Sequence, residues 1–129
     1  MNYNTAERLR AEAVRIQDYL EITASDDPNE LVARLSELNV YLARTGRMLA
    51  EATCLRDRAV AAVYASQAEV IGRMSATVAR RFVDSQTADE NELVVWLDRL
   101  NRACTHQSEN LRTQISFAKQ QLELTRKGY

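Results

Sequence analysis

The sequence has little proline, glycine and aromatic residue, and these shortages exclude most fold classes. Its 129 residues include one proline, three glycines and 6% aromatic side chains. An all-β or loop-rich domain needs turn-forming residues every ~8 to 12 positions, so the sequence does not fit those classes. A core with so few rings must be built from Leu, Ile, Val and Ala, as in helical bundles and coiled coils. The sequence therefore predicts an all-α protein.

Long apolar runs are also absent. The longest uninterrupted run, Ala59 to Ala65, covers seven residues, whereas a helix needs about 20 to span a bilayer. We therefore expect no membrane segment. Two cysteines, Cys54 and Cys104, stand in unrelated surroundings in a chain with no visible signal peptide. Free thiols of this kind predict a cytoplasmic location.

The sequence lacks the residue patterns that carry catalysis or metal binding. His106 is the single histidine, and Cys104, two positions earlier, would point about 200° away from it on a helix. No second Cys/His pair completes a tetrahedral metal site, and no glycine-rich phosphate loop is present. Cys104 falls on a leucine stripe, which favours a small buried hydrophobe over a nucleophile. We predict no enzyme activity, no cofactor and no metal.

Capping residues and glycines divide the chain into four predicted helices. The clearest boundary is Asp27 followed by Pro28, because aspartate is a good N-cap and proline fits the first helical position. Three further starts are predicted from N-cap signals, at Asn4 with Glu7, at Ser75, and at Thr87 with Glu90. Gly72 is expected to end the second helix in the left-handed conformation that glycine favours, and Gly128 is expected to end the fourth. The predicted helices cover residues of about 5–24, 28–71, 75–85 and 88–127, in one domain of residues 1–129.

Apolar residues at spacings of three, four and seven give each predicted helix a buried side. The stripes are Leu9, Ala13, Ile16 and Leu20 in the first helix; Leu31, Leu35, Leu38, Leu42 and Leu49, with a second line through Tyr41, Met48 and Leu55, in the second; Val78 and Phe82 in the third; and Leu93, Leu97, Leu100, Cys104, Leu111, Ile115 and Leu122 in the fourth. The tight turn at Pro28 predicts that the first two helices are antiparallel neighbours. The fold prediction is an elongated antiparallel helical bundle or coiled-coil-like hairpin with two long and two shorter helices.

Two apolar lines on the second helix imply two packing partners, within the fold or in another chain. Gln107 places a polar side chain where the repeat of the fourth helix expects an apolar one, a device that can fix register or oligomeric state. The alternative is a solvated face beside a narrow stripe. We predict a homo-oligomer or protein-partner interface on the following residues: Leu42, Leu49, Leu100, Cys104, Gln107, Leu111 and Ile115.

Charge is unevenly distributed along a chain whose net charge is −1. Residues 84–98 hold five acids and no base, whereas residues 99–129 hold six bases and two acids. Acids in the first turn and bases in the last turn of one helix stabilise its dipole by about 0.3 to 1 kcal/mol each, which explains the asymmetry by itself. The alternative prediction is a basic face that binds nucleic acid through Arg99, Arg102, Arg112 and Lys119.

A set of short motifs lies in the last third of the chain: D-R-L-N-R at 98–102, T-H-Q at 105–107, L-R at 111–112 and S-x-A-K at 116–119. With these motifs the segment from Asp89 to Leu122 resembles short helical proteins of phages, prophages and related mobile elements. The resemblance implies an accessory protein in the cytoplasm of a bacterial host, acting in DNA replication or recombination or against a host system. Together these observations predict a non-enzymatic helical interaction protein, an adaptor, inhibitor or scaffold that self-associates. The alternative is a nucleic-acid-binding accessory protein.

Overall fold

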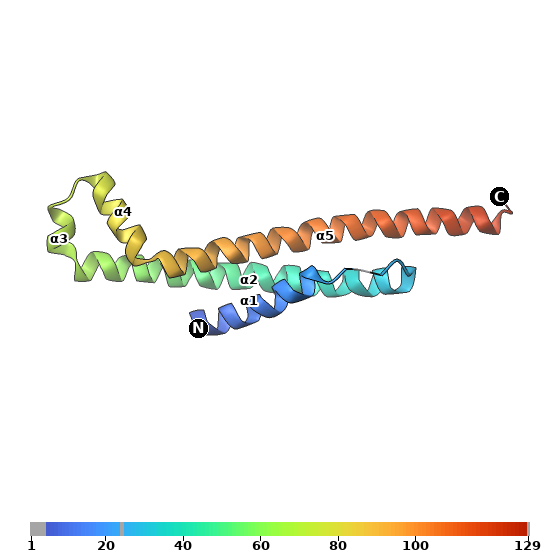
Figure 1. Cartoon of the computed structure of the whole chain (residues 1–129), viewed down its shortest axis with the longest axis horizontal. Coiled ribbons are helices and arrows are strands. Elements are labelled where there is room, and N and C mark those ends of the chain that lie inside the picture. Colours follow the sequence, from blue (N-terminus) through green and yellow to red (C-terminus); the bar gives the residue numbers. More distant parts are fainter. Residues whose placement is uncertain (1–4, 24, 129) are drawn as a thin grey trace.

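A computed structural model describes residues 5–23 and 25–128. In these ranges the chain forms five α-helices and no strand, which confirms the all-α prediction. The helices are α1 (Ala6–Glu21), α2 (Pro28–Ser66), α3 (Ala68–Gly72), α4 (Ala76–Gln86) and α5 (Ala88–Arg126) (Figure 1). No helix in the described ranges has the length and apolar content that crossing a membrane would require.

The two longest helices, α2 and α5, run antiparallel and form the main packing surface of the molecule (Figure 1). Each contains 39 residues, which corresponds to about 58 Å at 1.5 Å per residue. The shorter α1 lies against both helices, along the part of α5 that extends from Asp89 to Gln107, and α5 continues beyond the first residue of α2 (Figure 1). The molecule therefore has three packed helices in its middle and two helices at the end where α2 begins.

The N-terminal helix α1 buries the stripe that the sequence predicts. Leu9, Ala13, Ile16 and Leu20 are all buried against the other two helices. The N-cap is Thr5, whose hydroxyl accepts a hydrogen bond from the Arg8 backbone N–H at 3.2 Å. The prediction of a cap at Asn4 falls outside the described residues, and the helix begins one residue later than that cap requires. α1 and α2 are antiparallel neighbours, as predicted (Figure 1). The predicted tight turn between them is wrong, because α1 ends at Glu21 and six residues separate it from Pro28.

The predicted second helix is divided at Gln67, which separates α2 from α3. Gln67 has φ −117° and ψ 23°, yet its N–H still bonds to the Val63 carbonyl and its own carbonyl still accepts from the Ile71 N–H, both at 2.9 Å. The division is therefore a kink that preserves the helical hydrogen bonds. Gly72 does not adopt the predicted left-handed conformation, since Gly128, with φ 78°, is the one positive-φ glycine in the described ranges. The stop predicted at Gly128 is confirmed.

Two predictions about α4 and the start of α5 are wrong in detail. The buried residues of α4 are Ala79 and Val83, whereas Val78 is 52% exposed. Thr87 continues this stripe by four residues and is fully buried. Its hydroxyl donates to the Val83 carbonyl at 3.0 Å and therefore does not form the capping box predicted with Glu90. The buried threonine thus ties the end of α4 to the start of α5. The predicted N-cap at Ser75 is confirmed, since its hydroxyl accepts from the Val78 N–H.

A partly buried polar contact joins α2 to α5. The Asn101 amide nitrogen donates to the Leu42 carbonyl at 3.1 Å and to the Thr45 hydroxyl at 3.0 Å, and Thr45 is fully buried. Gly46 is adjacent to this contact, but a Cβ there would meet the Asn101 side chain at 3.7 Å, an ordinary van der Waals distance. Close backbone approach therefore does not explain the glycine.

Candidate functional site

Gln107, the polar residue on the predicted packing side of α5, contacts the end of α1. Its amide nitrogen donates a 2.9 Å hydrogen bond to the Leu20 carbonyl, and its amide oxygen accepts one of 3.2 Å from Arg34 of α2. The last carbonyls of a helix have no partner within the helix. Gln107 therefore caps α1 within the chain, and its predicted role in fixing the register of an oligomer stays a prediction.

Arg34 completes the attachment of α1 from the side of α2. It donates to the Tyr19 carbonyl at 3.2 Å, and its guanidinium carbon lies 4.4 Å from the centre of the Tyr19 ring. The Tyr19 hydroxyl donates to a Glu37 carboxylate oxygen at 2.5 Å. Burial and this hydrogen bond raise the pKa of Tyr19 above its usual value, so the phenol stays protonated at physiological pH. The backbone carbonyl, ring and hydroxyl of Tyr19 thus all contact side chains of α2.

Two further polar contacts hold α1 in place. Glu12 accepts two hydrogen bonds from Arg44 of α2, at 2.6 and 2.8 Å. The side-chain hydrogen bond from Arg44 holds the pKa of Glu12 below its usual range. On the α5 side, the indole N–H of Trp96 donates to Gln17 at 3.2 Å. Polar contacts to both long helices therefore occur along most of α1.

The residues predicted to form an oligomer interface lie in or against the core of a single chain. Leu100, Cys104 and Leu111 are at most 4% exposed. The other apolar residues of the predicted set pack against that core: Leu42, Leu49 and Ile115. These residues contact helices of the same chain, which covers most of their surface. Their assignment to an interface stays a prediction.

His106 and Cys104 lie in different environments on α5. The His106 side chain is 74% exposed and lies 3.9 Å from Glu109. Cys104 is fully buried, and burial raises the pKa of its thiol, which disfavours the reactive thiolate. No cluster of three or more His, Cys, Asp and Glu side chains that could hold a metal ion occurs in the described ranges.

The four residues of the predicted nucleic-acid face are exposed but do not share one side of α5. At about 100° per residue, Arg99 and Arg102 are about 60° apart, and Arg112 and Lys119 are about 20° apart. The two pairs lie on different sides of the helix. Arg102 also forms an ion pair of 3.1 Å with Asp98. A straight nucleic-acid backbone would therefore not meet all four residues together.

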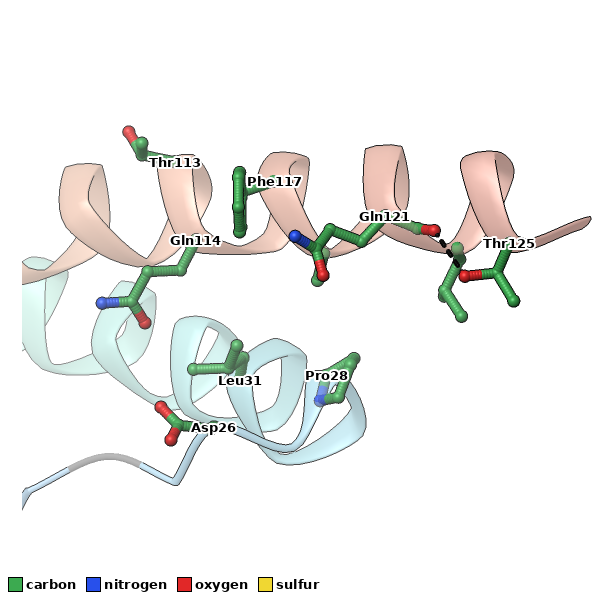
Figure 2. A pocket seen from close by; sticks show the side chains of 10 residues that line it. Asp26, Pro28, Leu31, Thr113, Gln114, Phe117, Gln121 and Thr125 are labelled. Atoms are coloured by element: carbon green, nitrogen blue, oxygen red, sulfur yellow. Dashed lines mark hydrogen bonds between the residues drawn. The ribbon is translucent and has the colours of Figure 1, made fainter. Parts of the chain in front are cut away.

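An open apolar surface lies where α2 begins and α5 extends beyond it. We call it the open-end groove; it has a volume of about 700 Å³ and is lined by Asp26, Pro28, Leu31, Thr113, Gln114, Phe117, Ala118, Gln121, Leu122 and Thr125. Figure 2 shows Pro28 and Leu31 on one wall and Gln114, Phe117 and Gln121 on the other. Phe117 is 61% exposed and Leu122 is 57% exposed. The groove thus combines a shaped apolar surface with a rim of amides and hydroxyls.

None of the residues of the predicted interface lines this groove. The predicted stripe of α5 runs through Ile115 and Leu122, but Phe117 lies outside that stripe and is exposed. Phe117, Leu122 and Leu124, near the end of the last predicted helix, are the residues that could have indicated an open apolar surface there. The contact between Gln107 and Leu20 has no comparable signal, because its acceptor is a backbone carbonyl.

The chain was compared with protein families, curated proteins and solved structures. No family model, no curated protein and no solved structure matches the chain.

Proposed function

We propose that this chain is a non-enzymatic helical interaction protein that self-associates and serves as an adaptor, inhibitor or scaffold for another macromolecule. The observation that carries the proposal is the open-end groove between α2 and α5. Phe117 and Leu122 line it and are each more than half exposed. Contiguous exposed apolar surface with a polar rim marks interaction sites on proteins.

The chemistry of the groove supports binding over catalysis. Its polar lining consists of one carboxylate, Asp26, together with the hydroxyls and amides of Thr113, Gln114, Gln121 and Thr125. General acid–base or nucleophilic catalysis needs a positioned pair of groups, typically a nucleophile within hydrogen-bond reach of a base. The groove has one titratable side chain, so its contribution is shape and apolar surface.

The biological setting that we propose is a phage-type accessory role in the cytoplasm of a bacterial host. This part of the proposal is supported by the motif resemblance between Asp89 and Leu122. Two motif residues, Asn101 and Gln107, bond to α2 and to α1, and Leu111 is buried. Residues with packing roles of this kind would be shared by proteins of similar architecture, whatever their partners.

Size-exclusion chromatography with light scattering tests self-association. We expect the full chain, at concentrations of about 1 to 100 μM, to reach twice its 14.7 kDa mass, with the dimer fraction rising with concentration by mass action. A mass that stays at one chain across this range would overturn the proposal of self-association.

Nucleic-acid binding is the second candidate function. This function is favoured by three basic side chains that form no ion pair within the described part of the chain, those of Arg99, Arg112 and Lys119. Their spread around α5 argues against it. Binding to single- and double-stranded DNA is measured between about 50 and 200 mM salt, a range over which phosphate contacts weaken steeply. Salt-sensitive binding that is lost on changing Arg99, Arg112 and Lys119 to glutamine would support this function. Equal binding by the variant, or no binding at low salt, would remove it.

A further inference from the structure

We propose that two copies of this chain pair end to end about a two-fold axis, each placing the end of its α5 helix in the open-end groove of the other. The inference rests on the proposed self-association and names the surface that would carry it. Three observations support it: the course of the groove, the nature of the helix end beside it, and the distribution of unpaired charge.

The open-end groove continues the surface on which α1 lies. Trp96 and Gln107 of α5 bond to Gln17 and Leu20 of α1. Gln114 and Gln121 follow Gln107 at spacings of seven, so they lie on the same side of α5, and both line the groove. α1 ends at Glu21, before it reaches them. The middle of the molecule thus packs a third helix on a surface that is left open at this end, and an added helix would extend the three-helix packing.

The end of α5 has the composition expected of such an added helix. Phe117, Leu122 and Leu124 are 61%, 57% and 53% exposed, and α5 continues to Arg126 past the start of α2 (Figure 1). Groove and helix end belong to the same end of the molecule. A two-fold axis there places each helix end in the groove of the other copy in a single operation, because a patch that carries both halves of an interaction is self-complementary.

Charge at this end also favours a second copy as the occupant. Three acids, Asp26, Asp27 and Glu30, lie at or beside the start of α2, and three bases, Lys119, Arg126 and Lys127, lie along the end of α5. None of these six takes part in an ion pair within the described part of the chain. A basic helix end entering a groove with an acidic mouth brings opposite charges together twice in a two-fold dimer, which favours this pairing over other docking arrangements.

The first test changes the apolar contact. The substitution Phe117→Asp places a charge in the proposed interface, while Val40→Asp is the matched control, since Val40 is 68% exposed and also lies on a long helix. We expect the dimer dissociation constant to rise at least about tenfold for Phe117→Asp and to stay unchanged for Val40→Asp. Circular dichroism checks that both variants remain helical. Dimerisation of Phe117→Asp as tight as that of the parent would overturn this surface while leaving self-association intact, whereas a monomeric parent would overturn both.

The second test exchanges charges between copies. One variant carries Lys119→Glu and Arg126→Glu, and the other carries Asp26→Lys and Glu30→Lys. Each alone sets like charges against each other and is expected to be largely monomeric at a concentration where the parent is dimeric. An equal mixture restores opposite charges at both contacts, so we expect a heterodimer, measured by native mass spectrometry. A mixture that remains monomeric, or single variants that dimerise like the parent, would contradict the proposed arrangement.

Discussion

The side-chain amide nitrogen of Gln107 donates a 2.9 Å hydrogen bond to the backbone carbonyl oxygen of Leu20, 87 residues earlier in the chain. Arg34 donates to the carbonyl of the preceding residue, Tyr19, and to the Gln107 amide oxygen. The end of α1 is thus attached to α2 and α5 through one continuous set of hydrogen bonds. The polar middle of α5 serves the internal packing of the protein.

Removing the Gln107 amide should loosen α1 selectively. For Gln107→Leu we expect the free energy of unfolding to fall by about 1 to 2 kcal/mol, because the Leu20 carbonyl and Arg34 each lose a partner. Hydrogen exchange should speed up in α1 while the amides of α2 and α5 keep their protection. His106→Ala is the control, since that side chain is 74% exposed and exposed substitutions usually change stability by less than about 0.5 kcal/mol. Uniform acceleration across all helices would contradict this assignment.

Replacing Gly46 should stabilise the protein. The glycine lies inside α2, and a Cβ at this position would meet the Asn101 side chain at 3.7 Å without a clash. Alanine is favoured over glycine in a helix interior by up to about 1 kcal/mol, so Gly46→Ala should raise the free energy of unfolding by about that amount. Gly128→Ala is the contrasting variant, because its φ of 78° is strained for alanine. Denaturant titration measures the free energy of unfolding of both variants. Destabilisation by Gly46→Ala would show that Asn101 cannot accommodate the methyl group.

The Glu12–Arg44 pair should make α1 sensitive to acid. The hydrogen bond from Arg44 holds the pKa of Glu12 in the folded chain below its usual value. The stability that the ionised carboxylate contributes is therefore present above the pKa of the unfolded chain and is lost as the pH falls through the folded pKa. Relative to the parent, Glu12→Gln should be less stable at pH 7 by about 1 to 2 kcal/mol, since the hydrogen bonds are charge-assisted but partly exposed.

At a pH below the folded pKa the parent carries a neutral Glu12, and the difference between the two proteins should disappear. Urea unfolding at neutral and acid pH measures the difference. A gap that stays constant across the pH range would show that ionisation of Glu12 contributes nothing.

The parts of the fold that follow from local pattern were predictable from the sequence. The α1 stripe and the Leu93, Leu97 and Leu100 stripe are buried as their spacing requires, and Pro28 begins α2. The kink at Gln67 was not predictable from the sequence. Glutamine is not a helix-breaking residue, and the helical hydrogen bonds to and from Gln67 are kept. The burial of Ala79 in place of Val78 was not predictable either, since it depends on where Thr87 packs, which is a tertiary effect.

Some features of the candidate site were likewise predictable from the sequence and others were not. The sequence pattern identified Gln107 as an anomaly on a packing helix, but its partner is a main-chain carbonyl, which has no residue signature. Leu122 was part of a predicted stripe, whereas the exposure of Phe117 depends on α1 ending at Glu21, short of the groove. Helix periodicity shows which side of a helix is apolar, but how far a neighbouring helix covers that side is set by chain lengths and turns.

The position of α1 between α2 and α5 also constrains the order of folding. Its buried residues Leu9, Ala13, Ile16 and Leu20 belong to one core with residues of both long helices. The surface that receives α1 is therefore complete only after α2 and α5 have paired, which requires closure of a chain segment that includes α3 and α4. We therefore expect α1 to dock late in folding. Substitutions in its stripe should mainly accelerate unfolding and leave the folding rate nearly unchanged.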